Sequence, residues 1–420
     1  MTGRNQSGRP TVHIIGAGLS GLAAAVALSK GPHAIALHEG ARQAGGRCRS
    51  YFDATLGMEI DNGNHLLLSG NSSARAFCRR IGTEDQLAGP AEAVFPFFDL
   101  ESGARWEVRP NAGPLPWWIF QASRRVPGTK ASDYLALARL LRTDKTATIG
   151  SRLACSGTLY RKLWQPFLLA ALNTDPPESS AALAGAVIRE TLAKGGRACR
   201  PLIAAKGLGS AFVDPAIRFL EGQGANIRLG HPLRALAGDN GAVTALDFDD
   251  ETISLGPDDR VILAVPPPAA AALLPGLSVP VKFRSIVNAH FKMPPPAALP
   301  SILGVIGGTV EWIFAFPDRI SITISGADRL LDIPRETLIE TLWSDVQAAA
   351  GIEAPLPPWQ IIRERRATFA ATPEEDAKRP APETRFANCF LAGDWTATGL
   401  PATIEGSIRS GNRAAALAGT

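Results

Sequence analysis

Several residue types are scarce in this chain of 420 residues, and each scarcity excludes a class of protein. The five cysteines form no C-x-x-C pair, which excludes a disulfide framework and favours reduced thiols in the cytoplasm. The six histidines are scattered without metal-ligand spacing, so no metal site is expected. No apolar run is long enough to cross a bilayer, and residues 1–10 are polar, so neither a transmembrane helix nor a signal peptide is expected.

The charge balance excludes a large nucleic-acid interface. The formal net charge is +4, the pI is about 8.9, and lysines and arginines are not concentrated in any run. The length exceeds that of one ordinary hydrophobic core, which predicts two domains. We therefore expect a cytoplasmic protein that acts on a small molecule.

Residues 12–22 (VHIIGAGLSGL) carry the first motif with a chemical meaning. An apolar strand leads into Gly16, Gly18 and Gly21, and an alanine-rich helix follows. The G-x-G-x-x-G spacing allows a tight turn and lets the backbone approach a pyrophosphate at the positive end of the helix. A second apolar strand ends at Glu39, whose carboxylate can accept hydrogen bonds from a ribose diol. This order of elements predicts a dinucleotide-binding fold, and NAD is the simplest ligand it suggests.

Two further motifs favour FAD over NAD. Gly45 and Gly46 precede Arg47, whose planar guanidinium can meet a phosphate or a flavin edge, and Gly393 and Asp394 follow an apolar strand near the end of the chain. Both motifs resemble those of the flavin amine oxidase and phytoene desaturase superfamily. That resemblance implies that FAD is the cofactor and that Asp394 meets its ribityl and pyrophosphate region.

The same resemblance gives the expected fold class and domains. We expect an α/β protein with a Rossmann-type FAD-binding domain, formed by residues 10–85, 200–275 and 385–420. An interleaved α+β domain, residues 86–199 and 276–384, is expected to bind the substrate. Apolar strands are expected at residues 283–291, 311–316 and 320–324, and amphipathic helices at 134–142 and 159–172.

A narrower resemblance comes from residues 61–68 (DNGNHLLL), 163–174 (LWQPFLLAALNT) and 393–406 (GDWTATGLPATIEG). These are similar to the squalene-associated branch of the superfamily, the hydroxysqualene dehydroxylases. The resemblance implies a flavin-proximal loop and a cofactor-binding set that is completed by the following residues: Gly63, Asn64, Leu233, Thr403 and Ile404. It also implies reductive removal of an allylic hydroxyl from a hydrophobic C30 isoprenoid.

That reaction needs an acid, because hydroxide is a poor leaving group. Asp61 and Glu405 are candidates if an apolar pocket raises their pKa, and His65 is a third because its pKa lies near neutrality. Each has a structural alternative: Asp61 could cap a turn, His65 could pack against the flavin, and Glu405 could support a helix N-terminus. The allylic cation also needs shielding from water, and the hydride must come from the flavin.

Two aromatic segments remain open to more than one interpretation. Residues 117–120 (WWIF), followed by Arg124 and Arg125, fit either a membrane interface or the protein core. A poorly soluble substrate favours peripheral contact with the inner face of the cell membrane. Trp312, Phe314 and Phe316 alternate along one strand face, as either substrate wall or core.

Other functions are compatible with the same motifs. A carotenoid-type desaturase differs only in the direction of electron flow. An amine oxidase would favour an aromatic cage, which is poorly supplied by three tyrosines. A flavin- or isoprenoid-binding carrier is the non-enzyme alternative. A second complete G-x-G-x-x-G is missing, so no NADPH domain is expected and the electron donor is not identified.

Overall fold

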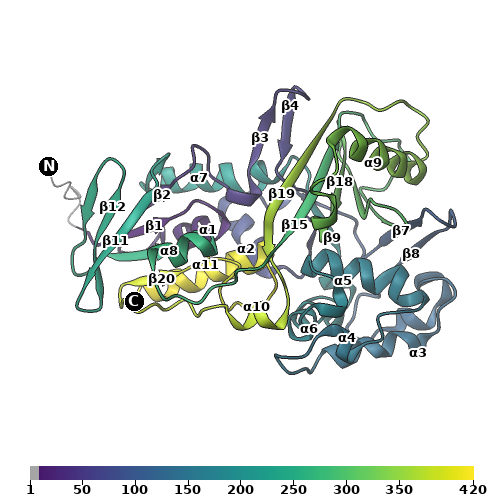
Figure 1. Ribbon diagram of the computed structural model, residues 1–420, viewed down its shortest axis with the longest axis horizontal. Helices are drawn as coiled ribbons and strands as arrows, with labels where there is room; N and C mark the ends of the chain where they lie inside the picture. The colour runs from purple at the N-terminus through teal and green to yellow at the C-terminus, as the bar shows by residue number, and fades with distance from the viewer. Residues whose placement is uncertain (1–8) are drawn as a thin grey trace.

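The computed structural model describes residues 9–420 of the chain. Residues 1–8, where no signal peptide is expected, lie outside the described part. A parallel sheet and a larger mixed sheet occupy opposite ends of the elongated molecule, with the chain crossing between them several times (Figure 1). This confirms the expected α/β class with an interleaved second domain.

The smaller end is built on a five-stranded sheet in the order β10-β2-β1-β14-β20. All four strand pairs are parallel. The strands are β1 (Thr11–Ile15), β2 (Ala34–Glu39), β10 (Asn226–Leu229), β14 (Arg260–Leu263) and β20 (Cys389–Leu391). They come from the three segments expected to form the FAD-binding domain, although the domain boundaries themselves stay a prediction.

Helices cover one face of this sheet and a three-stranded antiparallel sheet covers the other. The helices are α1 (Leu19–Leu28), α2 (Ser72–Ile81), α7 (Asp214–Gly222) and α11 (Ile404–Ala418). The opposite layer holds β11 (Leu233–Asp239), β12 (Ala242–Phe248), β13 (Thr252–Ser254) and the short helix α8 (Pro267–Leu273). Because side chains alternate along a strand, Val12 and Ile14 pack on the helices while Ile15 packs on the other side.

A chain of buried histidines joins β1, β2 and the antiparallel layer. Nδ1 of His13 lies 3.2 Å from Nε2 of His38, and Nδ1 of His38 lies 3.0 Å from Nδ1 of His231. Nε2 of His231 lies 2.9 Å from Asp250. Burial lowers the pKa of His13 to about 4 and that of His38 to about 3, so both rings are neutral at pH 7. One proton on each of these two rings is enough to connect the chain of contacts.

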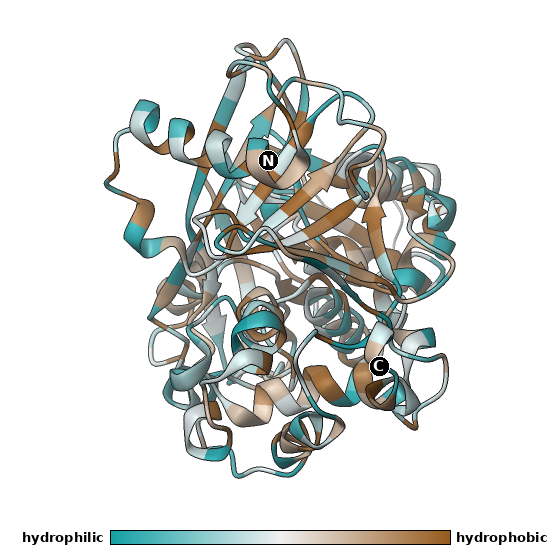
Figure 2. Cartoon of the chain, turned by 90° about the vertical axis from the view of Figure 1, so that its right-hand side faces the viewer, coloured by the Kyte–Doolittle hydropathy of each residue, from teal (hydrophilic) through white to brown (hydrophobic). Residues whose placement is uncertain are grey.

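The larger end is a seven-stranded sheet in the order β19-β15-β18-β17-β16-β7-β8. Its strands are β7 (Phe95–Asp99), β8 (Arg105–Val108), β15 (Phe283–Phe291), β16 (Ile302–Ile306), β17 (Trp312–Ala315), β18 (Ile320–Ile324) and β19 (Trp359–Phe369). β7 and β16 are parallel and the other pairs are antiparallel. The three strands expected at 283–291, 311–316 and 320–324 are confirmed, and Figure 2 shows the largely hydrophobic colouring of this sheet.

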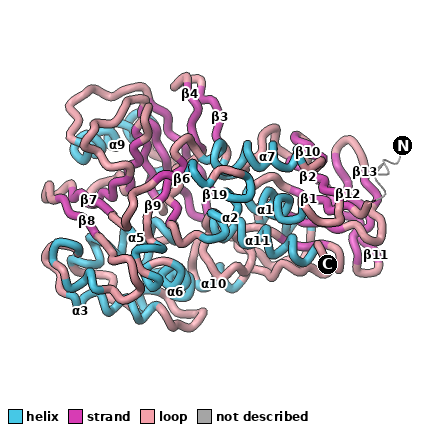
Figure 3. The backbone as a smooth tube through the Cα atoms, turned by 180° about the vertical axis from the view of Figure 1, so that it is seen from behind, coloured by secondary structure: helices cyan, strands magenta, loops and turns pink. Residues whose placement is uncertain are grey.

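The two faces of the large sheet have different cover. Helix α9 (Arg335–Ala350) packs on one face through Leu342 and Val346. The other face, here called the inner face, packs against a cluster of helical segments that Figure 3 shows at the same end of the molecule as β7 and β8. These segments include α3 (Ala131–Tyr134), α4 (Ile149–Arg152), α5 (Gln165–Leu172) and α6 (Ala181–Glu190).

Two helix predictions are modified by the structure. The helix expected at 134–142 is instead the end of a short α3 followed by a 3₁₀ helix over Leu135–Leu140. The apolar residues of this segment therefore lie on a helix with three residues per turn. The helix expected at 159–172 begins as a π-helix, Tyr160–Trp164, before α5. Pro166 lies in the first turn of α5. Proline has no N–H, so it cannot donate the hydrogen bond to the carbonyl four residues earlier that a regular α-helix would contain.

Short elements connect the two ends. They are β3 (Ser50–Asp53), β4 (Met58–Asp61), β5 (Leu67–Leu68), β6 (Leu87–Ala88), β9 (Pro201–Ala204) and α10 (Pro373–Ala377). Across residues 9–420, no helix is both long enough and apolar enough to cross a membrane. The site described below lies where these connections bring the two sheets together.

Candidate cofactor and substrate site

The glycine loop after β1 has the shape that a dinucleotide needs. Gly16 has φ +107°, and a β-carbon there would lie 2.4 Å from the carbonyl oxygen of Ala264. A β-carbon on Gly21 would lie 1.9 Å from the carbonyl oxygen of Gly16, so strand and helix are in direct contact. A β-carbon on Gly18 would meet nothing within 4 Å. Helix α1 also begins without a side-chain cap, so its first N–H groups are free to bind a pyrophosphate.

Glu39 closes one side of this loop. Its carboxylate accepts hydrogen bonds from the backbone N–H of Ala17 at 2.7 Å and of Ala41 at 2.8 Å. The backbone N–H of His231 donates to the Glu39 carbonyl, and Pro232 packs against Gly40. Leu233 follows Pro232 and begins β11, and its role in cofactor binding stays a prediction.

The second glycine motif is joined to the first. The N–H of Gly45 donates to the carbonyl of Ala17, and Gly46, at φ +56°, lies against Gly18. Arg47 follows this motif, and 43% of its side chain is exposed although its guanidinium is paired with a buried carboxylate.

Arg47 and Asp394 connect the two ends of the sequence. The guanidinium Nη2 of Arg47 donates to both carboxylate oxygens of Asp394, at 2.8 and 2.7 Å, and Nη1 donates to the carbonyl of Ala367 on β19. The neighbouring carboxylate raises the pKa of Arg47 above its ordinary value. Gly393 is required before this pair because a β-carbon there would lie 2.3 Å from the indole nitrogen of Trp395. The three glycine motifs therefore meet in one cradle.

Thr403 and Ile404 begin the last helix of this cradle. The hydroxyl of Thr403 accepts a hydrogen bond from the N–H of Gly406 at 3.0 Å and so caps α11, of which Ile404 is the first residue. Helix α11 packs tightly on α1, since a β-carbon on Gly411 would lie 2.1 Å from the carbonyl oxygen of Ser20. The uncapped α1 helix, the open space at Gly18, the exposed Arg47 and the acid Glu39 together fit FAD.

The loop from Asp61 to His65 crosses from this cradle to the inner face. The Asp61 carboxylate accepts hydrogen bonds from the Ser50 hydroxyl at 2.5 Å and the Leu208 N–H at 2.8 Å. Burial raises the pKa of the Asp61 carboxyl. Gly63 passes Asn288 so closely that a β-carbon would lie 3.1 Å from the amide nitrogen. Burial, together with the charge of Arg47, lowers the pKa of His65 to about 4, which leaves its imidazole neutral at pH 7.

Glu405 supports a helix N-terminus, which is the structural alternative that the sequence left open for it. Its carboxylate accepts hydrogen bonds from the N–H groups of Ser73 at 3.0 Å and Ala74 at 2.9 Å, and it pairs with Arg409 at 2.9 Å. These bonds cap the N-terminus of α2, where the preceding Asn71 makes no capping bond. The geometry agrees with the helix-supporting alternative, although the helix supported is α2 and not α11.

Side chains on the inner face change from polar to aromatic across the large sheet. Strand register places one row of partners side by side: Asn288, Thr323, Trp312, Gly304, Phe97 and Trp106. The polar members lie under the 61–65 loop, where Asn64 donates to Thr323 at 3.2 Å. The aromatic members lie farther away: Phe97 stacks on Trp106 at 5.5 Å and meets Trp312 edge-on at 5.7 Å. Trp312, Phe314 and Phe316 all point to this face.

The structure also reveals candidates that sequence patterns missed. Asn288, Thr323, Phe97 and Trp106 join the site only through strand pairing, for which the sequence carries no local signal. Glu311 directly precedes β17 and accepts a hydrogen bond from the N–H of Ser325 at 2.8 Å. Burial raises the pKa of Glu311 to about 7, so its carboxyl can hold a proton at neutral pH.

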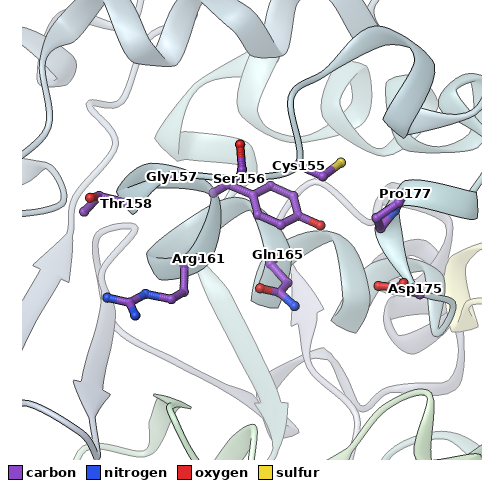
Figure 4. A pocket seen from close by; sticks show the side chains of 9 residues that line it. Cys155, Ser156, Gly157, Thr158, Arg161, Gln165, Asp175 and Pro177 are labelled. Carbon is purple, nitrogen blue, oxygen red and sulfur yellow. The ribbon is translucent and has the colours of Figure 1, made fainter.

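A separate cavity opens in the helical cluster. It has a volume of about 620 Å³ and is lined by Tyr160, Gln165 and Asp175 among others (Figure 4). Its mixed polar lining does not suit a hydrocarbon, and it includes none of the residues of the glycine cradle. The candidate site is the cradle with the inner face, which the 61–65 loop joins through the contacts of Asn64 with Asn288 and Thr323.

The fold and the cradle define a flavin-dependent oxidoreductase. The family model of flavin containing amine oxidoreductases matches residues 19–418, and the chain belongs to this family, with FAD as its cofactor. Two solved structures show the same fold, a double mutant of putrescine oxidase and a cyclohexylamine oxidase from Brevibacterium oxydans. Their TM-scores are 0.71 and 0.70, each at 17% identity, and they cover 97% and 98% of this chain and 98% and 99% of their own.

Much higher identity is found to curated bacterial proteins. A protein of Sinorhizobium fredii and one of Rhodopseudomonas palustris are each 58% identical to this chain, over 97% of its length and 98% of theirs. A protein of Zymomonas mobilis is 48% identical over the same shares. All three are named hydroxysqualene dehydroxylase.

Proposed function

We propose that this chain is an FAD-dependent dehydroxylase that reduces hydroxysqualene to squalene in bacterial squalene and hopanoid synthesis. The observation that carries the proposal is the 58% identity, over 97% of the chain, to two proteins named for that activity. The matched length spans the segments that form both the cradle and the inner face. The proposal is independent of the amine oxidase structures, whose 17% identity supports only the fold.

The cradle supplies the cofactor site of the proposed enzyme. Gly16, Gly18 and Gly21 would hold the pyrophosphate, Glu39 the ribose, and Arg47 with Asp394 the junction with the flavin. Bound FAD supplies the hydride that replaces the hydroxyl group. The residues of the chain must bind the isoprenoid, exclude water and deliver a proton to the departing oxygen.

The inner face suits an allylic cation flanked by hydrocarbon. Its aromatic half offers ring faces that stabilise positive charge and an apolar wall that excludes water. An amine oxidase would instead need aromatic rings around the flavin. The three tyrosines lie elsewhere: Tyr51 is on the β3–β4 hairpin, and Tyr134 and Tyr160 are in the helical cluster. This distribution favours an isoprenoid over an amine.

The proton donor of the proposed reaction is expected to be Asp61 or His65, which lie on the loop between cradle and inner face. The raised pKa of Asp61 favours a protonated carboxyl, whereas the lowered pKa of His65 disfavours a protonated ring. The capping bonds of Glu405 engage both of its oxygens, which makes it the least suitable of the original candidates.

The proposal includes peripheral contact with the cytoplasmic face of the membrane. The side chains of residues 117–120 differ in exposure: Trp118 and Ile119 are buried, while Trp117 is 64% and Phe120 65% exposed. Leu115 and Leu135 are similarly exposed, and Arg124 and Arg125 are close in sequence. Exposed rings beside cations suit an interface with anionic lipid, from which a C30 hydrocarbon can be taken.

An anaerobic half-reaction tests the proposed activity. The flavin of the purified holoenzyme is reduced chemically, hydroxysqualene is added, and flavin absorbance is followed while isoprenoids are extracted. We expect reoxidation of the flavin with an equal amount of squalene. Reoxidation without squalene, or bleaching of the oxidised enzyme by a saturated isoprenoid or an amine, would replace the dehydroxylase proposal with an oxidative one.

A further inference from the structure

Several buried polar atoms are left without a partner among residues 9–420, and two of them belong to residues that neighbour Thr323 on the inner face. One is the amide oxygen Oδ1 of Asn64, an acceptor, and the other is the indole Nε1–H of Trp312, a donor. Both residues are 7% exposed. Leaving such atoms unpaired in a folded core is unfavourable, so each one calls for a ligand or a bound water.

The orientation of the Asn64 amide is fixed by its neighbours. Its Nδ2 lies 3.2 Å from the carbonyl oxygen of Ile322 and 3.2 Å from the hydroxyl of Thr323. A flipped amide would place two acceptors together at Ile322, so Nδ2 must be the atom on that side. The Thr323 hydroxyl donates to Asn288 at 2.7 Å and cannot also donate to Asn64. The Asn64 Oδ1 is therefore a true acceptor without a donor.

The orientation of the Trp312 ring follows from its contact with β16. Its Cζ3 atom would lie 3.3 Å from a β-carbon on Gly304, so the benzene edge of the indole leans toward that strand. The Nε1 edge lies on the opposite side of the ring, away from β16. Thr323 on β18 is the register partner of Trp312 and is also the hydrogen-bond partner of Asn64. The two residues with orphan atoms are therefore both neighbours of Thr323.

An alcohol group needs one acceptor and one donor. We infer that Asn64 Oδ1 accepts the hydroxyl hydrogen of the substrate while Trp312 Nε1–H donates to its oxygen. The allylic carbon then lies at the boundary between the polar and aromatic halves of the inner face, with the loop that leads to the FAD cradle directly above. This inference rests on the proposed function, because it takes an isoprenoid alcohol as the ligand. It makes Asn64 a substrate-binding residue in addition to a neighbour of the cofactor.

The test compares two ligands that differ by the hydroxyl group alone. Binding of hydroxysqualene and of squalene to the oxidised holoenzyme is measured by perturbation of the flavin absorbance. Trp312→Phe keeps the aromatic ring and removes the N–H, and we expect it to weaken hydroxysqualene about two- to tenfold relative to squalene, the value of one hydrogen bond. Asn64→Leu should also reduce the affinity for hydroxysqualene relative to squalene. The effects of Trp312→Phe and Asn64→Leu on this ratio should not be additive in the double variant.

The chain offers a matched control. Trp106 also has a buried indole N–H without a partner in the described chain, but it lies at the far aromatic end of the row. Trp106→Phe is expected to leave the ratio of the two affinities unchanged even if both ligands bind more weakly. A Trp312→Phe enzyme with the ratio of the wild type would overturn the inference.

Other outcomes separate the possible failures. Loss of flavin from Asn64→Leu, with an unchanged affinity ratio in Trp312→Phe, would assign the Asn64 oxygen to the cofactor and overturn the inference. A wild-type holoenzyme that neither binds nor converts hydroxysqualene would overturn the proposed function and the inference together. Normal turnover by the wild type with unchanged ratios in both variants would overturn the inference alone.

Discussion

The cofactor cradle and the inner face of the large sheet are built in different ways. The cradle consists mainly of backbone: Gly16, Gly18 and Gly21 place N–H groups and a helix end around one open space. The inner face consists of side chains on neighbouring strands, such as Thr323, Trp312 and Phe97, which meet only after the sheet has formed. A site made of backbone groups is determined by local sequence. A site made of neighbouring side chains on different strands is determined by which strands pair and in which register.

Glycine substitutions are the strongest way to break the cradle. Gly18→Ala adds a methyl group to open space, so we expect an intact fold that has lost FAD at least about a hundredfold in affinity, the cost of blocking a close backbone approach. Gly21→Ala should prevent folding, because its β-carbon would overlap the Gly16 carbonyl. Flavin absorbance and circular dichroism separate the two results. Full flavin occupancy in Gly18→Ala would contradict the position assigned to the pyrophosphate.

Truncation of a core side chain on the inner face should lower stability and leave flavin binding intact, the opposite of the result expected for Gly18→Ala. Phe97 is 2% exposed and packs between Trp106 and Trp312. Phe97→Ala is expected to lower the free energy of unfolding by about 3–5 kcal/mol while the purified enzyme keeps its flavin. Denaturant unfolding and the ratio of flavin to protein absorbance provide the measurement. Loss of flavin without loss of stability would show that the two regions are not independent.

Acid should destabilise the nucleotide-binding end. Burial lowers the pKa of His13 to about 4 and that of His38 to about 3, below the value of 6.5 for an exposed histidine. The folded state therefore binds fewer protons than the unfolded state, so stability is complete above pH 6.5 and falls as the pH drops toward 4. The loss should reach about 3 kcal/mol for each histidine at pH 4.

Unfolding curves from pH 7 to pH 4 measure this loss. His38→Phe should give a shallower pH dependence than the wild type. Equal slopes in the wild type and in His38→Phe would contradict the neutral histidine chain.

Removal of one charge tests how the ends of the sequence meet. Asp394→Ala leaves Arg47 without its carboxylate, and we expect at least about a tenfold loss of FAD affinity from the disrupted cradle. Asp144→Ala removes an exposed partner of Arg152 and serves as the control. Flavin content after gel filtration measures both. Retention of full flavin by Asp394→Ala would refute the assignment of the second FAD motif.

The smallest effect is expected at the surface. The double change Trp117→Ser and Phe120→Ser removes two exposed rings, and binding to anionic vesicles should weaken about tenfold while activity in detergent is kept. Phe52→Ser changes a ring that is equally exposed on the β3–β4 hairpin. Vesicle sedimentation should detect no change in that control. Equal weakening by both variants would mean that no particular surface faces the membrane.

Local patterns in the sequence predicted the parts of the cradle but not the contacts between distant segments that hold it together. The three glycine motifs, Glu39 and the strands around them lie where expected, because turn chemistry and apolar runs are local properties. The pairing of Arg47 with Asp394, 347 residues away, and the capping of α2 by Glu405 depend on how distant segments pack. Both roles became clear only from the structure.

The inner face could be predicted only in part. The period-two pattern of Trp312, Phe314 and Phe316 correctly placed them on one face, since alternation is a property of a single strand. Their neighbours Phe97 and Trp106 come from more than 200 positions earlier in the chain, and no local signal specifies which strands become partners. The orphan atoms of Asn64 and Trp312 likewise depend on hydrogen bonds that the sequence does not reveal.

The central claim is that cradle and inner face form one site, with the reacting carbon at the boundary of its polar and aromatic halves. A crystal structure of the FAD-loaded enzyme with squalene bound tests this most directly. The account predicts squalene along the inner face, with its central carbons between Asn64 and Trp312 and one arm passing toward Phe97 and Trp106. Squalene bound elsewhere, for example in the cavity beside Tyr160, or a flavin outside the glycine cradle, would contradict it.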